Sequence, residues 1–131
     1  MQEIINQILK NDPFLAGFGG VDLLDSGDGF VKLTVKFTPS LSRTGGIMHG
    51  GAIMSLLDTA GGLSIVTRGN LVNQVTLNLN TDFMRPVSSG PVTITGKVTR
   101  EGKSIVFCEM EIRDGQDTLC ARGTGSWFVF R

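Results

Sequence analysis

The feature that most constrains the fold is the nearly uncharged segment at residues 46–62, GIMHGGAIMSLLDTAGG. Glycines surround the only histidine, His49, and the apolar run that follows is interrupted by one carboxylate, Asp58. The segment predicts a helix from about residue 50 to residue 67, closed by Gly69 and Asn70. A helix with so wide an apolar surface must be buried, so the rest of the chain has to wrap around it.

The remaining residues supply a short helix and a set of strands. Apolar residues at helical spacing predict a helix over residues 1–12, and a hairpin is expected across the turn at residues 27–29. Alternating residues and turn signals predict strands at 21–26, 30–37, 74–83, 91–100, 104–113 and 118–130, with turns at 88–90, 101–103 and 114–116. Strands joined by short turns pair antiparallel, which predicts one α+β domain over residues 1–131, with the helix cradled in a curved sheet.

The composition excludes several classes of partner. Lys and Arg total 12 and Asp and Glu total 12, so no basic field is available to hold nucleic acid. No apolar stretch is long enough to span a membrane, and the first residues do not resemble a secretion signal. We therefore expect a cytoplasmic protein that binds neither nucleic acid nor membrane.

Two further features concern cysteines and subunits. Cys108 and Cys120 are too few for a disulfide scaffold, and with a single histidine they form no metal set, so we expect reduced core residues and no metal.

Apolar residues make up 40% of the chain, and an open sheet has exposed edge strands. If two copies paired their edge strands across a two-fold axis, the edges and the surplus apolar surface would be buried. The sequence therefore predicts a homodimer.

The helix entrance admits two interpretations. The glycines at positions 50 and 51 either permit tight packing or leave free N–H groups that stabilise an oxyanion. His49 is either a cap or a catalytic residue, and Asp58 is either a structural partner of a backbone group or arginine or a catalytic carboxylate. Helix geometry puts Gly50 and Asp58 roughly 12 Å apart. They are too far apart to act on one carbonyl within one subunit, but a two-fold contact would bring them together.

The strand after the helix contributes one more candidate. In VTLNLNTDFMRPV, polar residues alternate with apolar ones and predict a polar face. That face would hold Thr76, Asn78, Asn80 and Asp82. A solvent-facing strand has the same pattern, so Thr76 gains a separate role only if it lies beside Asp58.

These strings together resemble those of a known family. GIMHGGAIMSLLDTAGG, VTLNLNTDFMRPV and VTREGKSIVFCEMEIRDGQDTLCARGTGSW are similar to the hotdog-fold thioesterases, within them the PaaI-like acyl-CoA thioesterases of the phenylacetic-acid-degradation type. The resemblance covers about residues 19–128. It implies a hotdog fold, with a long central helix wrapped by a curved antiparallel sheet, and homodimers that often pair into homotetramers.

The resemblance also implies roles for individual residues. The Gly50 N–H would polarise the thioester carbonyl, and Asp58 of the other subunit would act as nucleophile or general base. Thr76 would help to hold the attacking water, and His49 would support the loop. Many relatives carry Asn six residues before this histidine, where it helps to position substrate or water. The chain has Arg43 there, so either Arg43 or Thr44 takes over this contact with the substrate, or the loop follows a different path. Further substrate contacts would come from Thr44, Gly51, Arg85, Arg100 and Lys103, and acyl contacts from Phe14, Phe18, Met48 and Leu57.

The function that this resemblance implies is hydrolysis of aryl- or medium-chain acyl-CoA to the free acid and CoA. The site would lie between two subunits and need no cofactor, because CoA is part of the substrate. One alternative is a module that binds acyl-CoA without turnover, which the retained Asp58 opposes. Another is a hydratase or dehydratase acting on acyl thioesters, but such enzymes usually use a histidine in a differently spaced motif.

Overall fold

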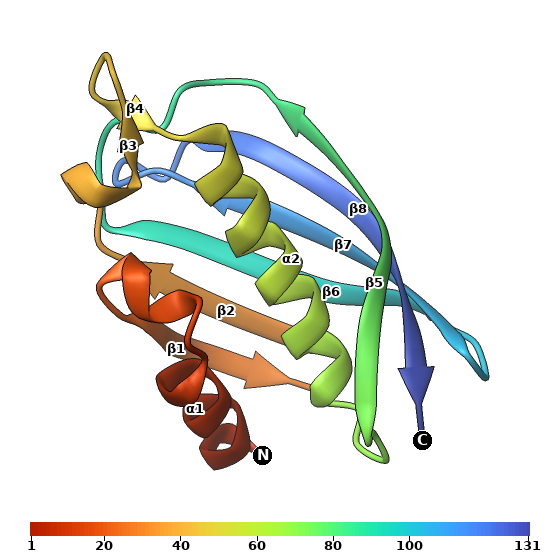
Figure 1. Ribbon diagram of the computed structural model, residues 1–131. Helices are drawn as coiled ribbons and strands as arrows, with labels where there is room; N and C mark the ends of the chain where they lie inside the picture. Colours follow the sequence, from red (N-terminus) through yellow and green to blue (C-terminus); the bar gives the residue numbers. More distant parts are fainter.

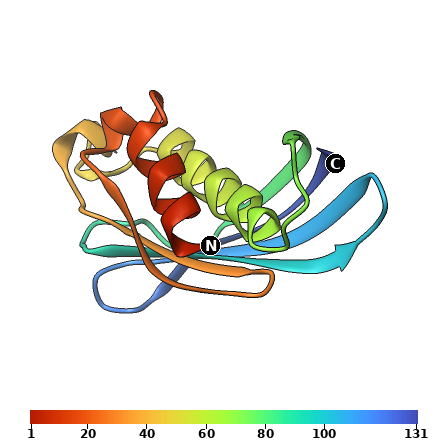
Figure 2. The ribbon, with the colours of Figure 1, turned by 90° about the horizontal axis from the view of Figure 1, so that it is seen from below.

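The apolar segment forms the long helix α2, Gly50–Val66, as predicted. In the computed structural model, which describes residues 1–131, α2 crosses one face of a curved sheet (Figure 1). Viewed along the sheet, both helices lie on the same side of it (Figure 2). The side chains buried along α2 come from all sides of the helix and include Ile53, Leu56, Leu57, Ala60, Leu63 and Ile65. The helix is therefore the centre of the core, which confirms the predicted α+β architecture.

Six strands make the sheet, and each pairs antiparallel with its neighbours. Their order across the sheet is β1-β2-β6-β7-β8-β5. All the predicted strands are present, with every bound within two residues of the expected one. They are β1 (Val21–Gly27), β2 (Phe30–Val35), β5 (Asn73–Phe83), β6 (Val92–Glu101), β7 (Ile105–Arg113) and β8 (Leu119–Phe130).

One expectation about a connection between strands was wrong. The turn at residues 88–90 was expected to join neighbouring strands, but β5 pairs with β8, whereas β6 lies between β2 and β7. Residues 84–91 therefore connect separated strands. Before α2 the chain forms the 3-10 turn η2 (Pro39–Leu41) and a small hairpin of β3 (Ser42–Arg43) and β4 (Ile47–Met48), which the sequence did not predict.

The N-terminal helix α1, Gln2–Asn11, packs beside the C-terminal half of α2 (Figure 1). A 3-10 turn, η1 (Leu15–Phe18), then leads into β1. Within α1, Ile5 and Leu9 are buried, whereas the side chains of Ile4 and Ile8 remain 51% and 38% exposed. Part of the apolar face of α1 is thus left uncovered.

One glycine explains how closely α2 approaches the sheet. A Cβ built on Gly96 of β6 would overlap the carbonyl group of Ala60 in α2. Because only glycine leaves room there, the helix axis can lie directly over the middle of the sheet. This contact fixes the position of α2 and, with it, the positions of Gly50 and Asp58.

The two cysteines are buried and unpaired. Burial raises the pKa of Cys108 to about 11 from 9.0, and a hydrogen bond with Ser64 opposes the shift. Because the folded state holds the thiol proton more tightly than the unfolded state, this contribution to stability is complete below pH 9 and is lost as the pH rises towards 11.

We therefore expect the free energy of unfolding to fall by on the order of 2–3 kcal/mol between these pH values because of this one thiol. Urea unfolding at a series of alkaline pH values measures the fall. In Cys108→Ala the decline should be shallower by that amount. Equal slopes in the two proteins would contradict the assignment.

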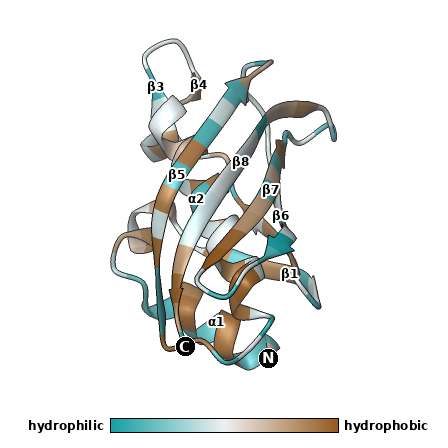
Figure 3. Cartoon of the chain, turned by 90° about the vertical axis from the view of Figure 1, so that its right-hand side faces the viewer, coloured by the Kyte–Doolittle hydropathy of each residue, from teal (hydrophilic) through white to brown (hydrophobic).

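Strand β5 forms one edge of the sheet, with β8 as its only neighbour (Figure 3). Bands of hydrophobic and hydrophilic residues alternate along it. Val75, Leu77 and Phe83 of this strand are each more than half exposed. An edge with free backbone groups and exposed apolar side chains is suited to pairing with another strand.

Neither helix of the structure is long and apolar enough to cross a membrane.

Candidate active site

The start of α2 is capped by His49. Its ring nitrogen Nδ1 accepts a hydrogen bond from the Gly51 N–H at 2.8 Å, and its carbonyl oxygen accepts from the N–H groups of Ala52 and Ile53. A neutral imidazole that accepts at Nδ1 carries its proton on Nε2. His49 thus has the cap role that the sequence left open, and Gly51, expected to contact substrate, uses its N–H within the chain.

The Gly50 N–H is the one donor of this first turn that stays free. It makes no hydrogen bond to any group of the chain, while the N–H groups of the next three residues are all used. Gly50 opens onto a hollow of about 330 Å³ that Arg43, Phe83, Met84 and Arg85 also line. A free N–H at the positive end of a helix is suited to stabilising a carbonyl oxygen that gains charge.

Asp58 lies half-buried on the side of α2 that faces β5. Thr76 of β5 donates a hydrogen bond from Oγ1 to Asp58 Oδ1 at 2.7 Å. This contact orients the carboxylate and leaves Oδ2 without a partner in the chain. The two residues share a second hollow, of about 200 Å³, with Asp12, Gln74 and Trp127 among its other lining residues. Burying a carboxylate among apolar residues costs free energy. Here the partial exposure of Asp58 and its hydrogen bond with Thr76 reduce that cost.

A β-bulge separates Thr76 from the other polar residues of its strand. The pairing of β5 with β8 shifts register between Thr76 and Asn78. Thr76 contacts α2 before the bulge, whereas beyond it Phe83 lies beside Gly50, 3.7 Å from the position of an added Cβ. A single polar face from Thr76 to Asp82 was therefore a wrong expectation, because an extra residue in a strand exchanges its two faces.

Within one chain the two hollows remain separate. Gly50 and Asp58 lie on the same straight helix, roughly 12 Å apart along its axis. Gly50 opens beside the C-terminal end of β5, and Asp58 lies beside its N-terminal half. Within one chain, the free Gly50 N–H and the Asp58 carboxylate therefore do not act on one atom.

The remaining substrate candidates divide between the two ends of the sheet. Arg43 and Arg85 line the hollow at Gly50, and Arg85 makes no side-chain hydrogen bond or ion pair. Arg43 donates to the carbonyl oxygen of the neighbouring Thr44, which is exposed. Arg100 and Lys103 lie at the β6–β7 turn, where neighbouring Glu101 pairs with Arg68 at the far end of α2. The structure therefore does not bring these two residues together with Gly50 in one chain.

Comparison with known proteins agrees with this architecture. Residues 45–121 match the model of the thioesterase superfamily. The chain belongs to the thioesterase superfamily. Its reaction class is accordingly thioester hydrolysis. A relative from Thermoplasma volcanium named "Putative esterase" is 42% identical, over 87% of this chain and 98% of that protein.

Similar solved structures identify the fold of this thioesterase and its branch of the superfamily. The PaaI protein from the phenylacetic acid degradation operon of E. coli is 27% identical and superposes with a TM-score of 0.86, covering 95% of this chain and 89% of that one. The fold is therefore the hotdog fold, and the PaaI-like assignment is confirmed. A hypothetical thioesterase from Streptococcus pneumoniae, solved with coenzyme A, shares the fold with a TM-score of 0.80 and 24% identity, over 88% and 90% of the two chains.

Sequence reasoning missed several residues around Asp58 in this thioesterase. Ile8 and Asp12 come from the N-terminal segment, and Gln74 from the start of β5. The amphipathic spacing of residues 1–12 predicts the helix but does not show which part of α2 it covers. Among the acyl candidates, Leu57, Met48 and Phe18 are buried in the core, and only Phe14 is exposed.

The cap role of His49 gives a testable prediction for this thioesterase. Asparagine at a helix N-cap also accepts a hydrogen bond, so His49→Asn should keep the stability of the wild type, whereas His49→Ala should lose about 1 kcal/mol of unfolding free energy. Urea denaturation of the three proteins measures both values. A full loss of thioester hydrolysis in a stable His49→Asn protein would show that the imidazole does more than cap the helix.

Proposed function

We propose that the protein hydrolyses acyl-CoA thioesters at a site formed between two copies of the chain, with Asp58 from one subunit and Gly50 from the other. The observation that carries the proposal is the arrangement of two incomplete half-sites along one exposed edge strand. The free Gly50 N–H lies beside Phe83, and Asp58 accepts from Thr76. Neither half can complete the reaction alone, because they are roughly 12 Å apart on one helix.

Antiparallel pairing of β5 with its own copy joins these halves. When Thr76 lies opposite the partner subunit's Phe83, Asp58 comes next to the partner subunit's Gly50. The two-fold axis then passes near Leu79 and Asn80, and symmetry creates a second identical site. The same pairing uses the free backbone groups of β5 and covers Val75, Leu77 and Phe83, each more than half exposed in the single chain.

The chemistry at the joined site is hydrolysis by an activated water. The Asp58 carboxylate takes a proton from water as the water oxygen attacks the thioester carbonyl carbon. The carbonyl oxygen becomes negatively charged and accepts a hydrogen bond from the Gly50 N–H. The C–S bond then breaks, and the CoA sulfur takes up the proton held by Asp58. Direct attack by Asp58 through a mixed anhydride gives the same products, and Thr76 orients the carboxylate in either case.

Coenzyme A is the thiol we propose because of the cations beside Gly50. Arg43 and Arg85 are exposed at that hollow, and neither guanidinium pairs with a carboxylate. Guanidinium groups bind phosphate through paired N–H donors. The S. pneumoniae hypothetical thioesterase with the same fold was solved with coenzyme A, which supports this choice.

The proposal is tested by incubating the purified protein with acetyl-, octanoyl-, benzoyl- and phenylacetyl-CoA and measuring release of the free thiol. Oxygen esters with the same acyl groups serve as the control for general esterase activity. We expect turnover of CoA thioesters by a protein whose mass in solution is that of a dimer or tetramer. Thiol release from none of the CoA esters, or turnover by a monomer, would contradict the proposal.

A further inference from the structure

Met54 is the one large apolar side chain of α2 that the chain leaves exposed. It is 38% exposed, whereas the other large apolar side chains of this helix are buried or half-buried. It lies four residues after Gly50 and four residues before Asp58. Residues at this spacing follow one face of a helix. Met54 therefore lies on the same face of α2 as Gly50 and Asp58, about 6 Å along the axis from each.

The edge strand β5 runs past this face of α2. Thr76 near its start contacts Asp58, and Phe83 at its end lies beside Gly50. The middle of β5 therefore lies beside the middle of the helical face, which is Met54. In the proposed dimer the two-fold axis also passes through the middle of β5. A two-fold axis that brings Gly50 and Asp58 of two subunits together leaves the residue halfway between them, Met54, opposite its own copy.

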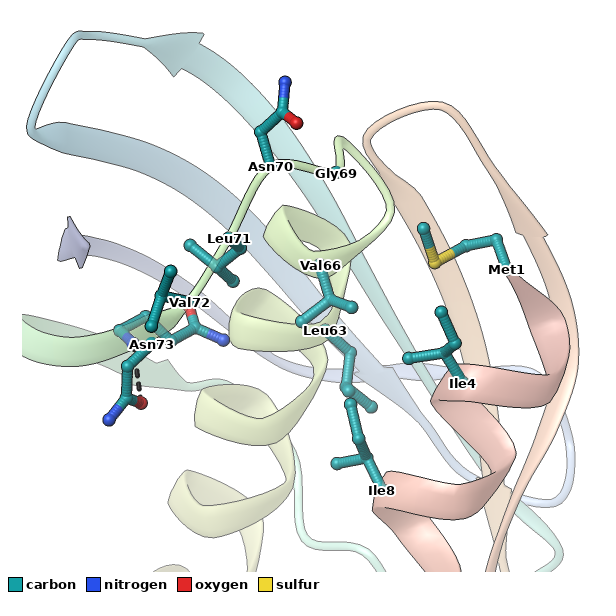
Figure 4. A pocket seen from close by; sticks show the side chains of 11 residues that line it. Met1, Ile4, Ile8, Leu63, Val66, Gly69, Asn70, Leu71, Val72 and Asn73 are labelled. Carbon is teal, nitrogen blue, oxygen red and sulfur yellow. Dashed lines mark hydrogen bonds between the residues drawn. The ribbon is translucent and has the colours of Figure 1, made fainter. Parts of the chain in front are cut away.

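The N-terminal helix does not reach Met54. Figure 4 shows that α1 approaches the other end of α2, where Ile4 and Ile8 lie beside Leu63 and Val66. Leu63 follows Met54 by nine residues, which is roughly 14 Å along the helix axis. An apolar side chain that its own chain leaves exposed is stabilised when another surface covers it.

We propose that Met54 is a positioning residue that packs against the partner subunit's Met54 on the two-fold axis, and that this contact sets the spacing between Asp58 and the partner subunit's Gly50. The inference rests on the proposed function, because it uses the same pairing of β5 strands. The two Asp58 carboxylates then lie on opposite sides of the axis, so only uncharged groups meet on it. One methionine pair borders both active sites, because each Met54 is about one helical turn from its own Gly50 and Asp58.

Methionine is suited to such a contact. A side chain on a two-fold axis meets its own copy, so the pair has to form a self-complementary contact. The methionine side chain is unbranched and has three rotatable bonds, which let two copies adjust to each other.

Cross-linking at position 54 tests the contact itself. Met54→Cys is treated with a short bismaleimide, and the products are separated by mass under denaturing conditions. We expect covalent dimers as the main product, since the native Cys108 and Cys120 are buried and do not compete. Asp25→Cys is the control, because Asp25 is exposed on β1 at the opposite edge of the sheet, and it should stay monomeric. No cross-linking at position 54, or as much at position 25, would overturn the proposal.

Turnover of the CoA ester that the wild type hydrolyses fastest tests the positioning role. Met54→Ala should lower kcat about tenfold and change KM by less than about twofold, because a misplacement of about 1 Å can cost about a hundredfold in rate. Its specific activity should rise with protein concentration, since the dimer is weakened. Met54→Leu has a similar volume and should recover most of the lost turnover.

The outcomes separate this inference from the proposed function. An unchanged kcat in Met54→Ala would overturn the positioning role and leave the thioesterase assignment in place. A wild-type protein that is monomeric, or that releases no thiol from any CoA ester, would overturn the proposed function and the role of Met54 with it.

Discussion

Asp58→Asn is expected to lower kcat for CoA thioester hydrolysis by at least about a hundredfold, the usual contribution of a general base. The amide that replaces the carboxylate cannot take a proton from water and is a poor nucleophile. Thr76 can still donate its hydrogen bond to the amide oxygen, so the local structure should persist. Thiol release measures turnover, and binding of a non-hydrolysable thioether analogue of the substrate measures the integrity of the site.

The matched control for this change is Asp12→Asn. Asp12 lines the same hollow as Asp58, but its Oδ1 accepts hydrogen bonds from the N–H groups of Phe14 and Leu15. An amide oxygen can accept the same bonds, so Asp12→Asn should retain wild-type turnover. If Asp58→Asn also retained it, Asp58 would be structural. If both variants lost activity alike, the effect would come from the charge of the hollow.

Gly50→Pro should remove the oxyanion donor and leave the helix in place. Proline has no N–H, and the first position of a helix is where it is best tolerated. The preceding residue must be extended, and His49 already is, with φ −61° and ψ 135°. Loss of one oxyanion donor typically lowers kcat by about 10²–10³-fold, and we expect a decrease in that range from steady-state measurements.

Gly50→Ala separates loss of the N–H from the bulk of a side chain. An alanine Cβ would lie 3.7 Å from Phe83 Cε1, which is ordinary van der Waals contact, and the N–H is kept. The alanine variant should therefore remain active. A fully active Gly50→Pro protein would exclude this N–H from the reaction, and an inactive alanine variant would show that the space beside Phe83 matters more than the donor.

Local pattern was sufficient to predict the two α-helices and the six strands of the sheet, because the chain alternates clearly between apolar periodicities and turn residues. The order of strands was not predictable in the same way. The signal at residues 88–90 is that of a turn, yet β5 pairs with β8, since pairing depends on long-range contacts with the helix and the other strands. Gly96 illustrates the point, because its role appears only when the Ala60 carbonyl is placed over it.

The site was predictable in residue type and less so in arrangement. Asp58 was identifiable as a lone carboxylate in an apolar run, but the choice of Thr76 over Asn78 depends on a bulge that alternation alone does not show. The use of the Gly51 N–H by His49 depends on a ring orientation. The hollow at Asp58 is lined by segments far apart in the sequence, from Ile8 to Trp127, so no local pattern predicts it.

If each active site takes Asp58 from one subunit and Gly50 from its partner, two variants that are inactive alone should restore activity when they are mixed. Differently tagged Asp58→Asn and Gly50→Pro chains are unfolded together, refolded, and assayed for thiol release, with mixed dimers confirmed by tandem affinity capture. Each mixed dimer would hold one intact site, so we predict recovery of roughly a quarter of wild-type turnover for random pairing. Mixed dimers with no more activity than the two parents would contradict the claim and place both groups in a site within one chain.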